Sequence, residues 1–478
     1  MTVTPVGDTK MLDPAHAPSA DLAALAPDAD IATKRAAVSQ WLSVHRIEEV
    51  ECVVPDLAGV ARGKVMPAQK FSDLVPLHLP DSIFFQTITG GYADFDGDNQ
   101  YAENDLDLIP DIATLRQVPW AKSPTAQVIH DSLLNTGEPL EHAPRQVLQR
   151  IIGLYAAEGW RPVVAPELEF YLTRRNTNPD EPLVPPVGRS GRAAASRQSY
   201  SISAVDEFDV IVDEIYDFAE DQGLEIDTII QEGGASQLEI NIKHGDPLLL
   251  ADQAFLFKRT IREAALRNDC YATFMAKPME DQPGSALHIH QSVVDIETGR
   301  SIFSDETGAS TDTFLHHVGG LQNYLAAAMC ILAPYVNSYR RLVPDAAAPI
   351  NLEWGKDNRS AGLRVPLSEP VARRVENRVA GADTNPYLAI AVSLACGYLG
   401  MRDRIEPRQA VQGSAYSADH GLPRGLQEAL QLFGSCQPLQ EALGTGFSQL
   451  FQAVKHEELN EYMRVISPWE REHLLLSV

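Results

Sequence analysis

Cysteine is scarce in this chain, with five residues among 478 and no CxxC pair. A disulfide framework needs paired cysteines and a zinc knuckle needs closely spaced ones, so neither is expected. The amino terminus has no basic segment followed by an apolar core, which a secretion signal requires. We therefore expect a cytoplasmic protein with a disordered, Ala/Pro/Asp-rich tail over residues 1–34.

Long apolar runs are also missing. The longest nearly uncharged stretch, from Tyr387 to Met401, is interrupted by Ser393 and two glycines. It reaches only about half to three-quarters of the length of a membrane span. We expect this stretch to be a buried helix, and no membrane partner is expected.

Basic residues are outnumbered: there are 39 Lys and Arg against 65 Asp and Glu, which gives a formal net charge of −26. This balance argues against a general affinity for nucleic acid or an anionic membrane, and it attracts cations such as metal ions or amines. Common nucleotide-binding and zinc motifs are absent as well. GVARGK at Gly59 is one residue short of a phosphate loop, GTGFSQ at Gly444 lacks a third glycine, and HEELN at His456 lacks the second histidine of a zinc helix.

The length and mixed composition are typical of a globular protein with two or three domains. We expect a boundary near residue 135, between a small β-rich domain over residues 35–135 and a larger α+β domain over residues 136–478. In the small domain, a helix from Arg35 to His45 precedes two strands around a turn at Asp56 to Gly59. The basic segment from Gly188 to Tyr200 is either a phosphate-side flap or a flexible loop.

In the larger domain, strand-like and helix-like periodicities alternate. The expected strands lie in RPVVAPELEFYL, SQLEINIK, ATFMAKP, ALHIHQSVVD, GLRVPL and RRVENRV. The expected helices run from Pro144 to about Gly159, Glu207 to Gln222, Leu248 to Asn268, Thr313 to Leu332, Asn385 to Met401 and Gly425 to Leu432.

Charged side chains alternate with apolar ones along four of these strands. In PELEFYL, Glu167 and Glu169 are two residues apart, so both carboxylates share one face of the strand. One such strand is more typical of a solvated face, but four together predict a polar funnel. The other members of the pattern are Glu239, with Glu232 in the preceding turn, His288 with His290, and Glu376 with Arg378.

Carboxylates with at most one imidazole per ion suit Mg²⁺ or Mn²⁺ better than zinc. Three arginines, Arg341, Arg359 and Arg364, have the planar forks that match phosphate and carboxylate oxygens. Each arginine alone is more typical of a surface salt bridge. The set indicates a site that handles phosphate.

Six ordered motifs, PELEFYL, QEGGASQLEIN, KPMEDQPGSALHIHQS, RRLVP, NRSAGLR and ENR, closely resemble the glutamine synthetase superfamily from about Ile47 to the carboxy terminus. The resemblance implies an α+β fold with a small N-terminal β-grasp domain and a larger catalytic domain, in which helices flank an antiparallel sheet. It also implies an ATP-dependent ligase that joins the γ-carboxylate of L-glutamate to an amine through an acyl-phosphate. Homo-oligomeric rings are expected, often dodecamers of two hexamers with sites between subunits.

By this resemblance, two to three Mg²⁺ or Mn²⁺ ions bind per site. The first is held by Glu169, Glu232 and Glu239 and the second by Glu167, His288 and Glu376. The glutamate-binding residues are Arg341, Arg378 and the backbone of Gly284. The residues near ATP are His290, Ser292, Arg359 and Arg364. Arg341 and Arg359 are the expected catalytic residues, because phosphoryl transfer depends mainly on positioning and charge neutralisation.

Three positions depart from the ammonia-using bacterial members. Ala347, in RLVPDAAAP, stands where those enzymes have a flap glutamate that helps bind ammonium. FFQTITGGY, from Phe84 to Tyr92, stands where an Asp-Gly-Ser-Ser loop serves a neighbouring subunit, and Pro283 replaces an asparagine in the glutamate-binding loop. Tyr416 also lacks the sequence context of the tyrosine that is adenylylated in those enzymes.

Loss of ammonium ligands with retention of every metal and phosphate ligand is similar to the γ-glutamylpolyamine (putrescine) synthetases. We therefore expect a di- or polyamine as the amine. The candidates for holding its distal ammonium are Glu280, Asp281 and Asp345. Two alternatives stay open: a glutamine synthetase that uses ammonia, and a non-catalytic relative.

Overall fold

The computed structural model describes residues 22, 25, 29–95, 104–344 and 347–478 of the chain. Most of the expected tail over residues 1–34 lies outside these ranges, as does the candidate ammonium ligand Asp345.

A six-stranded mixed sheet forms within the described N-terminal part of the chain, in the order β2-β1-β6-β4-β3 with β5 paired to β6. The hairpin between β1 and β2 is antiparallel, and its turn is closed by Asp56, whose Oδ1 accepts hydrogen bonds from the amides of Ala58 and Val60. The strands are β1 (Glu49–Pro55), β2 (Ala61–Pro67), β3 (Leu77–Pro80), β4 (Asp105–Pro110), β5 (Arg116–Gln117) and β6 (Thr125–Leu133).

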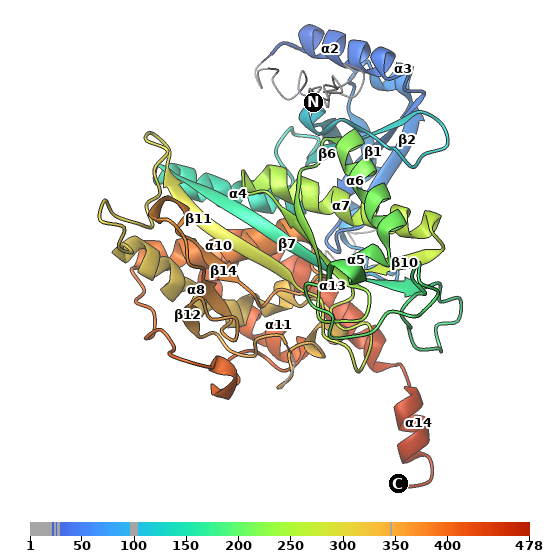
Figure 1. Cartoon of the computed structure of the whole chain (residues 1–478). Coiled ribbons are helices and arrows are strands. Elements are labelled where there is room, and N and C mark those ends of the chain that lie inside the picture. Colours follow the sequence, from blue (N-terminus) through green and yellow to red (C-terminus); the bar gives the residue numbers. More distant parts are fainter. Residues whose placement is uncertain (1–21, 23–24, 26–28, 96–103, 345–346) are drawn as a thin grey trace, which may run out of the picture.

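Helix α2 (Ile31–Val44) packs on this sheet through Val38 and Leu42 (Figure 1). It begins four residues before the expected start at Arg35, because Asp30 caps it by accepting a hydrogen bond from the Thr33 amide. The short helix α3 (Ala68–Phe71) follows β2.

The larger part contains an eight-stranded sheet among its described residues, in the order β12-β13-β14-β11-β7-β9-β8 with β10 paired to β7. All pairs are antiparallel except β12 with β13, which is parallel. The strands are β7 (Trp160–Arg174), β8 (Ile226–Gln231), β9 (Gln237–Ile242), β10 (Cys270–Thr273), β11 (Leu287–Asp295), β12 (Trp354–Lys356), β13 (Leu363–Val365) and β14 (Val375–Asn377).

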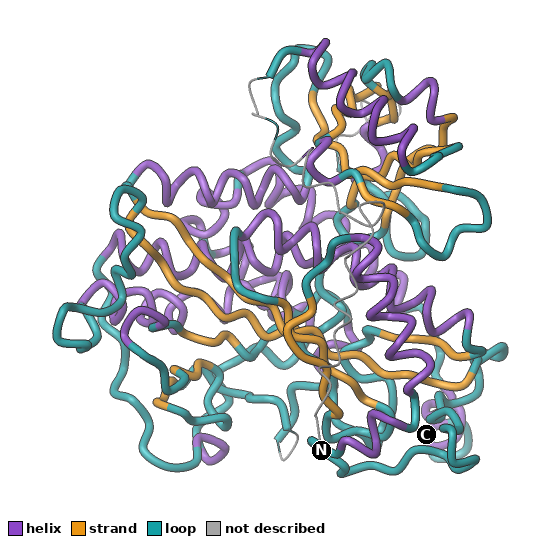
Figure 2. The backbone as a smooth tube through the Cα atoms, turned by 45° about the horizontal axis from the view of Figure 1, so that its top comes forward, coloured by secondary structure: helices purple, strands orange, loops and turns teal. Residues whose placement is uncertain are grey.

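Helices cover one face of this sheet (Figure 2), and within the helical layer α10 packs against α4, α7 and α8. The helices of the larger part are α4 (Pro144–Ala157), α5 (Ile202–Asp206), α6 (Asp209–Gln222), α7 (Pro247–Arg267), α8 (Asp312–Leu332), α9 (Val336–Tyr339), α10 (Pro386–Asp403), α11 (Leu426–Ser435), α12 (Gln437–Leu443), α13 (Thr445–Met463) and α14 (Pro468–Leu474).

The apolar stretch from Tyr387 to Met401 is a buried helix, as expected. It approaches α8 closely at Gly320 and Gly400, where a Cβ atom on Gly320 would lie 2.6 Å from the Cα of Gly400. No helix in the described ranges is long and apolar enough to cross a membrane.

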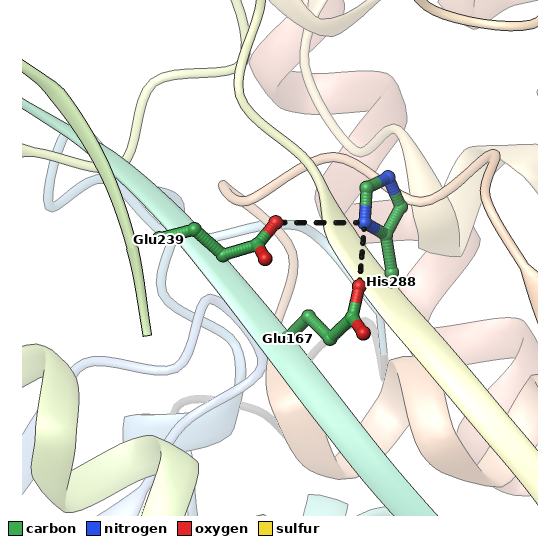
Figure 3. A group of neighbouring side chains, drawn as sticks. All are labelled: Glu167, Glu239 and His288. Carbon is green, nitrogen blue, oxygen red and sulfur yellow. Dashed lines mark hydrogen bonds and ion pairs between the residues drawn. The ribbon is translucent and has the colours of Figure 1, made fainter. Parts of the chain in front are cut away.

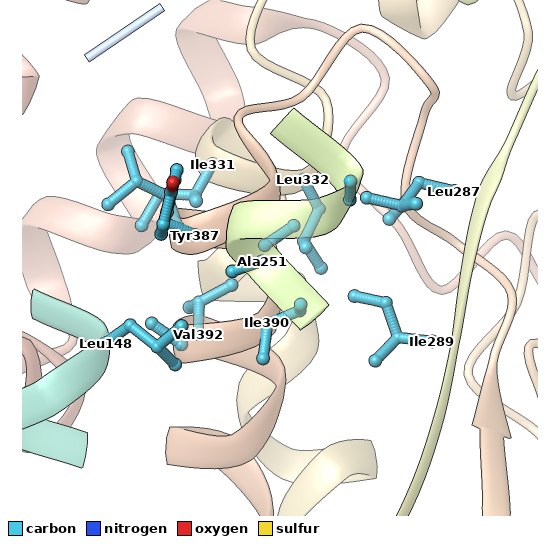
Figure 4. Packing of buried hydrophobic residues seen from close by; sticks show 14 of the residues in the cluster. Leu148, Ala251, Leu287, Ile289, Ile331, Leu332, Tyr387, Ile390 and Val392 are labelled. Atoms are coloured by element: carbon cyan, nitrogen blue, oxygen red, sulfur yellow. The ribbon is translucent and has the colours of Figure 1, made fainter. Parts of the chain in front are cut away.

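Along the central strands, alternate side chains face the hydrophobic core, and the side chains between them face the other side of the sheet. Leu287 and Ile289 of β11 point into the helical layer, where they meet Leu332 of α8 and Ile390 of α10 (Figure 4). The histidines at positions 288 and 290 therefore lie on the other face of the sheet. The expected strand in ATFMAKP ends early, at Thr273, where its pairing with β7 stops. The side chain of Asn337 binds both the amide and the carbonyl of Lys277 in the segment that follows.

Polar contacts with buried members join the N-terminal sheet to the helical layer. Arg145 of α4 is 3% exposed and binds Asp131 of β6 (2.7 Å), Asp111 beside β4 (2.5 Å) and Asp252 of α7 (3.1 Å). The side chain of Asn385, which caps α10, donates to the carbonyl of Asp56 in the β1–β2 turn at 2.9 Å. These contacts fix the position of the N-terminal sheet relative to the helical layer.

Candidate active site

The predicted metal ligands form a continuous row across the larger sheet. Strand register places Glu169 directly opposite Glu239, and Glu167 directly opposite His288. His290 is opposite Glu376 on the other side of β11. Figure 3 shows the side chains of Glu167, Glu239 and His288 turned toward one another across β7, β9 and β11.

The first predicted metal trio is brought together. Ligand atoms of Glu169, Glu232 and Glu239 all lie within 4.8 Å of one another. Glu232 reaches the group from the turn that follows β8, and the two other glutamates reach it from paired strands. Three carboxylate groups at this spacing suit a hard divalent cation.

The second predicted trio is arranged differently. Glu167 lies between both histidines, with Oε2 3.1 Å from Nδ1 of His288 and Oε1 2.8 Å from Nε2 of His290. Among the described residues, two groups within 4.8 Å contain Glu167: Glu167 with Glu239 and His288, and Glu167 with His290 and Glu376. The structure thus places His290, rather than His288, with Glu167 and Glu376.

Arginines hold Glu376 in place. Arg364 donates from Nη1 to Oε2 of Glu376 at 2.8 Å, and Arg378 binds the other carboxylate oxygen. Burial raises the pKa of Glu376, but Arg378 and the nearby histidines outweigh it and lower the pKa to about 2. Glu376 therefore stays ionised.

In the first trio, the pKa values are raised instead of lowered. Burial and repulsion from Glu232 raise the pKa of Glu169 to about 8, and burial and repulsion from Glu169 raise the pKa of Glu239 to about 10. Buried carboxylates that repel one another are stabilised by a cation or by protons. The residues present therefore fit a divalent metal ion at this position.

A cavity of about 370 Å³ lies over this row. It brings together all but two of the predicted site residues. Its predicted members are Glu167, Glu169, Glu232, Glu239, Gly284, His288, Arg341, Arg359, Arg364, Glu376 and Arg378.

The arginines of this cavity differ in burial and in the number of their hydrogen-bond partners. Arg341 is buried and donates to the carbonyls of Val379 (2.9 Å) and Arg378 (3.0 Å), so it also supports the backbone at the end of β14. Arg359 is exposed, and it has no hydrogen-bond or ion-pair partner among the described residues. Its charge acts on the nearby carboxylate of Glu232, and an exposed guanidinium at the cavity can bind an incoming anionic group.

The remaining two predicted residues, His290 and Ser292, line a second cavity of about 590 Å³. Glu167 and Asn241 line both cavities, so the two meet at this point of the sheet. Arg374 also lines the second cavity and donates to Nδ1 of His290 at 3.1 Å. Arg374 lies in the RRVENRV motif, but the sequence pattern assigned it no role.

Two supporting residues were also missed. Gln237 donates to Oε2 of Glu169 (3.2 Å) and to the carbonyl of Gly284 (3.0 Å). The hydroxyl of Tyr171 donates to the carbonyl of Pro283 at 2.8 Å. Tyr171 shares the face of Glu169 and Gln237 shares the face of Glu239, so the two-residue period could have identified both.

Two of the three departures from the ammonia-using pattern, Ala347 and Pro283, lie in the cavity wall. Ala347, Ala348 and Pro349 line it together with Tyr416, and the segment expected to be a flap or loop contributes Ser199 and Tyr200. Glu280 and Asp281 are exposed in the loop before β11 and do not line the cavity.

The loop from Phe84 to Tyr92 lies against α13 of its own chain. The amide of Ile88 donates to Glu458 at 2.7 Å, and the hydroxyl of Thr89 donates to Glu461 at 2.5 Å. This loop does not line the cavity described above.

A family model described as the catalytic domain of glutamine synthetase matches residues 141–474. The chain is 34% identical over 435 residues to γ-glutamylputrescine synthetase PuuA of Escherichia coli K12, with 89% of this chain and 91% of the relative covered. It is 31% identical over 459 residues to a glutamate–isopropylamine ligase of a Pseudomonas species, with 91% and 96% covered. A solved structure of GmaS without ligand superimposes with a TM-score of 0.78 at 26% identity, covering 91% of this chain and 98% of that one.

Proposed function

The chain belongs to the glutamine synthetase family and is an ATP-dependent glutamate–amine ligase, and from this premise we propose that its amine is a diamine or polyamine such as putrescine rather than ammonia. One observation carries the choice of amine. Ala347 lies in the cavity wall, and by the resemblance described above it stands where the ammonia-using members have a glutamate. The carboxylates among the described lining residues are all members of the proposed metal-binding set: Glu167, Glu169, Glu232, Glu239 and Glu376.

We propose that Glu169, Glu232 and Glu239 hold one divalent cation and that Glu167, with His288 or His290 and Glu376, holds a second. Mg²⁺ or Mn²⁺ ions bound there, two to three per site, would neutralise the phosphate charge of ATP and orient the substrates. The carboxylate-rich ligand set favours these metals over zinc.

The proposed binding of the substrates follows from the two cavities. ATP lies in the second cavity, beside His290 and Ser292, with its phosphates directed toward Glu167, where the cavities meet. Glutamate lies in the first cavity against Arg341, Arg378 and the backbone of Gly284. Arg359 and Arg364 neutralise charge on the transferring phosphoryl group.

The proposed reaction has two steps. An oxygen of the glutamate γ-carboxylate attacks the γ-phosphorus of ATP, and the bond to the bridging oxygen breaks to give γ-glutamyl phosphate and ADP. The nitrogen of the neutral amine then attacks the acyl carbon, and phosphate leaves as the amine loses a proton. The product is a γ-glutamyl amide.

The test is phosphate release from ATP with glutamate and Mg²⁺, comparing putrescine, spermidine, ethanolamine and ammonium. A clear preference for a polyamine is expected. A preference for ammonium would support a glutamine synthetase instead, and the absence of turnover with every amine would support a non-catalytic relative.

We further propose that residues 35–135 form a β-grasp domain and residues 136–478 the catalytic domain, in a ring-shaped homo-oligomer such as a dodecamer of two hexamers in the cytoplasm. In such a ring, the loop from Phe84 to Tyr92, which rests on α13 and does not line its own chain's cavity, would lie beside the site of a neighbouring subunit. Helix α14 extends from the body of the molecule (Figure 1); Trp469 within it and Leu475 directly after it are exposed, and a second subunit could cover them.

A further inference from the structure

Tyr416 supplies an aromatic side chain to the first cavity, beside the segment that contains Ala347. About half of the tyrosine surface (47%) is exposed. The ring therefore contributes a binding surface to the cavity and is not part of the hydrophobic core.

The backbone that carries Tyr416 is held firmly. It lies in a one-turn 3₁₀ helix, Ala415–Ser417. The amide of Ala415 donates to Oγ of Ser360 at 2.7 Å, and its carbonyl accepts from the side chain of Asn351 at 3.1 Å. Because Ser360 directly follows Arg359, these bonds fix the tyrosine relative to the arginine that we assign to the phosphoryl group.

The hydroxyl of Tyr416 reaches the wall that departs from the ammonia-using pattern, where it donates to the carbonyl of Ala347 at 3.4 Å. Two oxygen atoms and an aromatic side chain thus meet at this point of the cavity wall. An alkylammonium group can donate hydrogen bonds to such oxygens and is attracted to the face of such a ring.

The described residues that line the cavity offer no unassigned carboxylate for the second ammonium group of a diamine. The carboxylates among the described lining residues are assigned to the metal ions, and Glu280 and Asp281 lie outside the lining. The second ammonium of a diamine therefore needs another partner within the cavity. We propose that Tyr416, together with the carbonyl oxygen of Ala347, binds the distal ammonium group of the amine substrate; this inference rests on the proposed function above.

The experiment measures kcat and KM for putrescine and for butylamine, which has the same carbon chain but one charge. It compares the wild-type enzyme with Tyr416→Ala, which removes the ring, and Tyr416→Phe, which removes only the hydroxyl. The control is Tyr216→Ala, because Tyr216 of α6 is similarly exposed (44%) but lies outside both cavities.

Tyr416→Ala is expected to raise the KM for putrescine about tenfold, with a much smaller change for butylamine and unchanged KM values for glutamate and ATP. Tyr416→Phe is expected to give a smaller rise. An unchanged putrescine KM in a putrescine-preferring enzyme would overturn the Tyr416 subsite alone, and so would equal rises for putrescine and butylamine. Ammonium as the best wild-type substrate would overturn both this subsite and the proposed function.

Discussion

Glu169 on β7 and Glu239 on β9 are direct partners in an antiparallel ladder, and both carboxylates line the same cavity. Carboxylates directly opposite each other repel, and burial strengthens the effect. Burial and this repulsion raise the pKa of Glu239, and burial with repulsion from Glu232 raises the pKa of Glu169. The site is thus built at a cost to folding that a bound cation would offset.

Glu169→Gln is expected to reduce turnover to background, because it removes a proposed metal ligand while keeping the size of the side chain. The fold should survive, since the substitution also removes a repelling charge. Activity and melting temperature are measured with and without Mg²⁺. The wild-type melting temperature should rise with Mg²⁺ and that of the variant should rise less; substantial remaining activity would refute the metal assignment.

Arg359→Ala is expected to lower kcat by about 100-fold or more, with little change in melting temperature, because the guanidinium has no hydrogen-bond or ion-pair partner among the described residues. Steady-state kinetics with saturating glutamate and ATP test this. The matched control is Arg150→Ala, which removes an arginine that pairs with Glu141 on the surface. Equal, small effects of both substitutions would count against the assigned role.

Arg145→Ala is expected to destabilise the protein by about 3–5 kcal/mol, because it leaves the buried carboxylate of Asp252 without its cationic partner. The effect should appear as a lower melting temperature and earlier unfolding in urea. Arg145→Lys should recover only part of the loss, because a lysine cannot reach three carboxylates with a planar fork. Stability equal to wild type would show that the buried ion pairs are energetically neutral.

Three buried histidines are expected to weaken the fold in acid. Burial lowers the pKa of His317 to about 3 and of His130 and His142 to about 4. An unfolded histidine has a pKa of about 6.5, so between these values the unfolded state binds more protons. Stability is therefore present above pH 6.5 or so and is lost as the pH falls toward about 4.

His317 offers the clearest test, because neither of its ring nitrogens has a hydrogen-bond partner in the part of the chain that the structure describes. His317→Leu should lose less stability than wild type between about pH 7 and pH 5, by on the order of 1–2 kcal/mol. Glu169 and Glu239 have raised pKa values, so their contribution to stability changes with pH in the opposite direction. This contribution is the same in both proteins, and the difference between their pH profiles therefore reports on His317 alone. Identical pH profiles would mean that His317 does not carry the effect.

Local periodicity predicted much of the larger sheet. The two-residue alternation around Glu167 and Glu169 placed both carboxylates on the face that the structure assigns to the cavity. The same rule did not reveal which strands pair, because pairing depends on contacts distant in sequence. The helices after residue 435, α12 to α14, were not predicted.

The side-chain contacts within the site could not be predicted from single segments, because they join residues that are distant in sequence. The binding of Glu167 by both histidines and of Glu376 by two arginines arises only when β7, β11, β13 and β14 lie side by side. Tyr416 was considered only for modification, because nothing in its local sequence indicates that it meets Ala347. The division into domains and the assigned roles of the site residues remain predictions.

The meeting of the two cavities at Glu167 and Asn241 has a consequence for inhibitor chemistry. A compound that linked an ATP-like portion to a γ-glutamyl-amine portion would occupy both spaces through one short connection. The second portion would then bind at a high effective concentration, so the linked compound should bind far more tightly than either fragment. Because the connection would pass Glu167, the charge and length of the linker would decide its affinity.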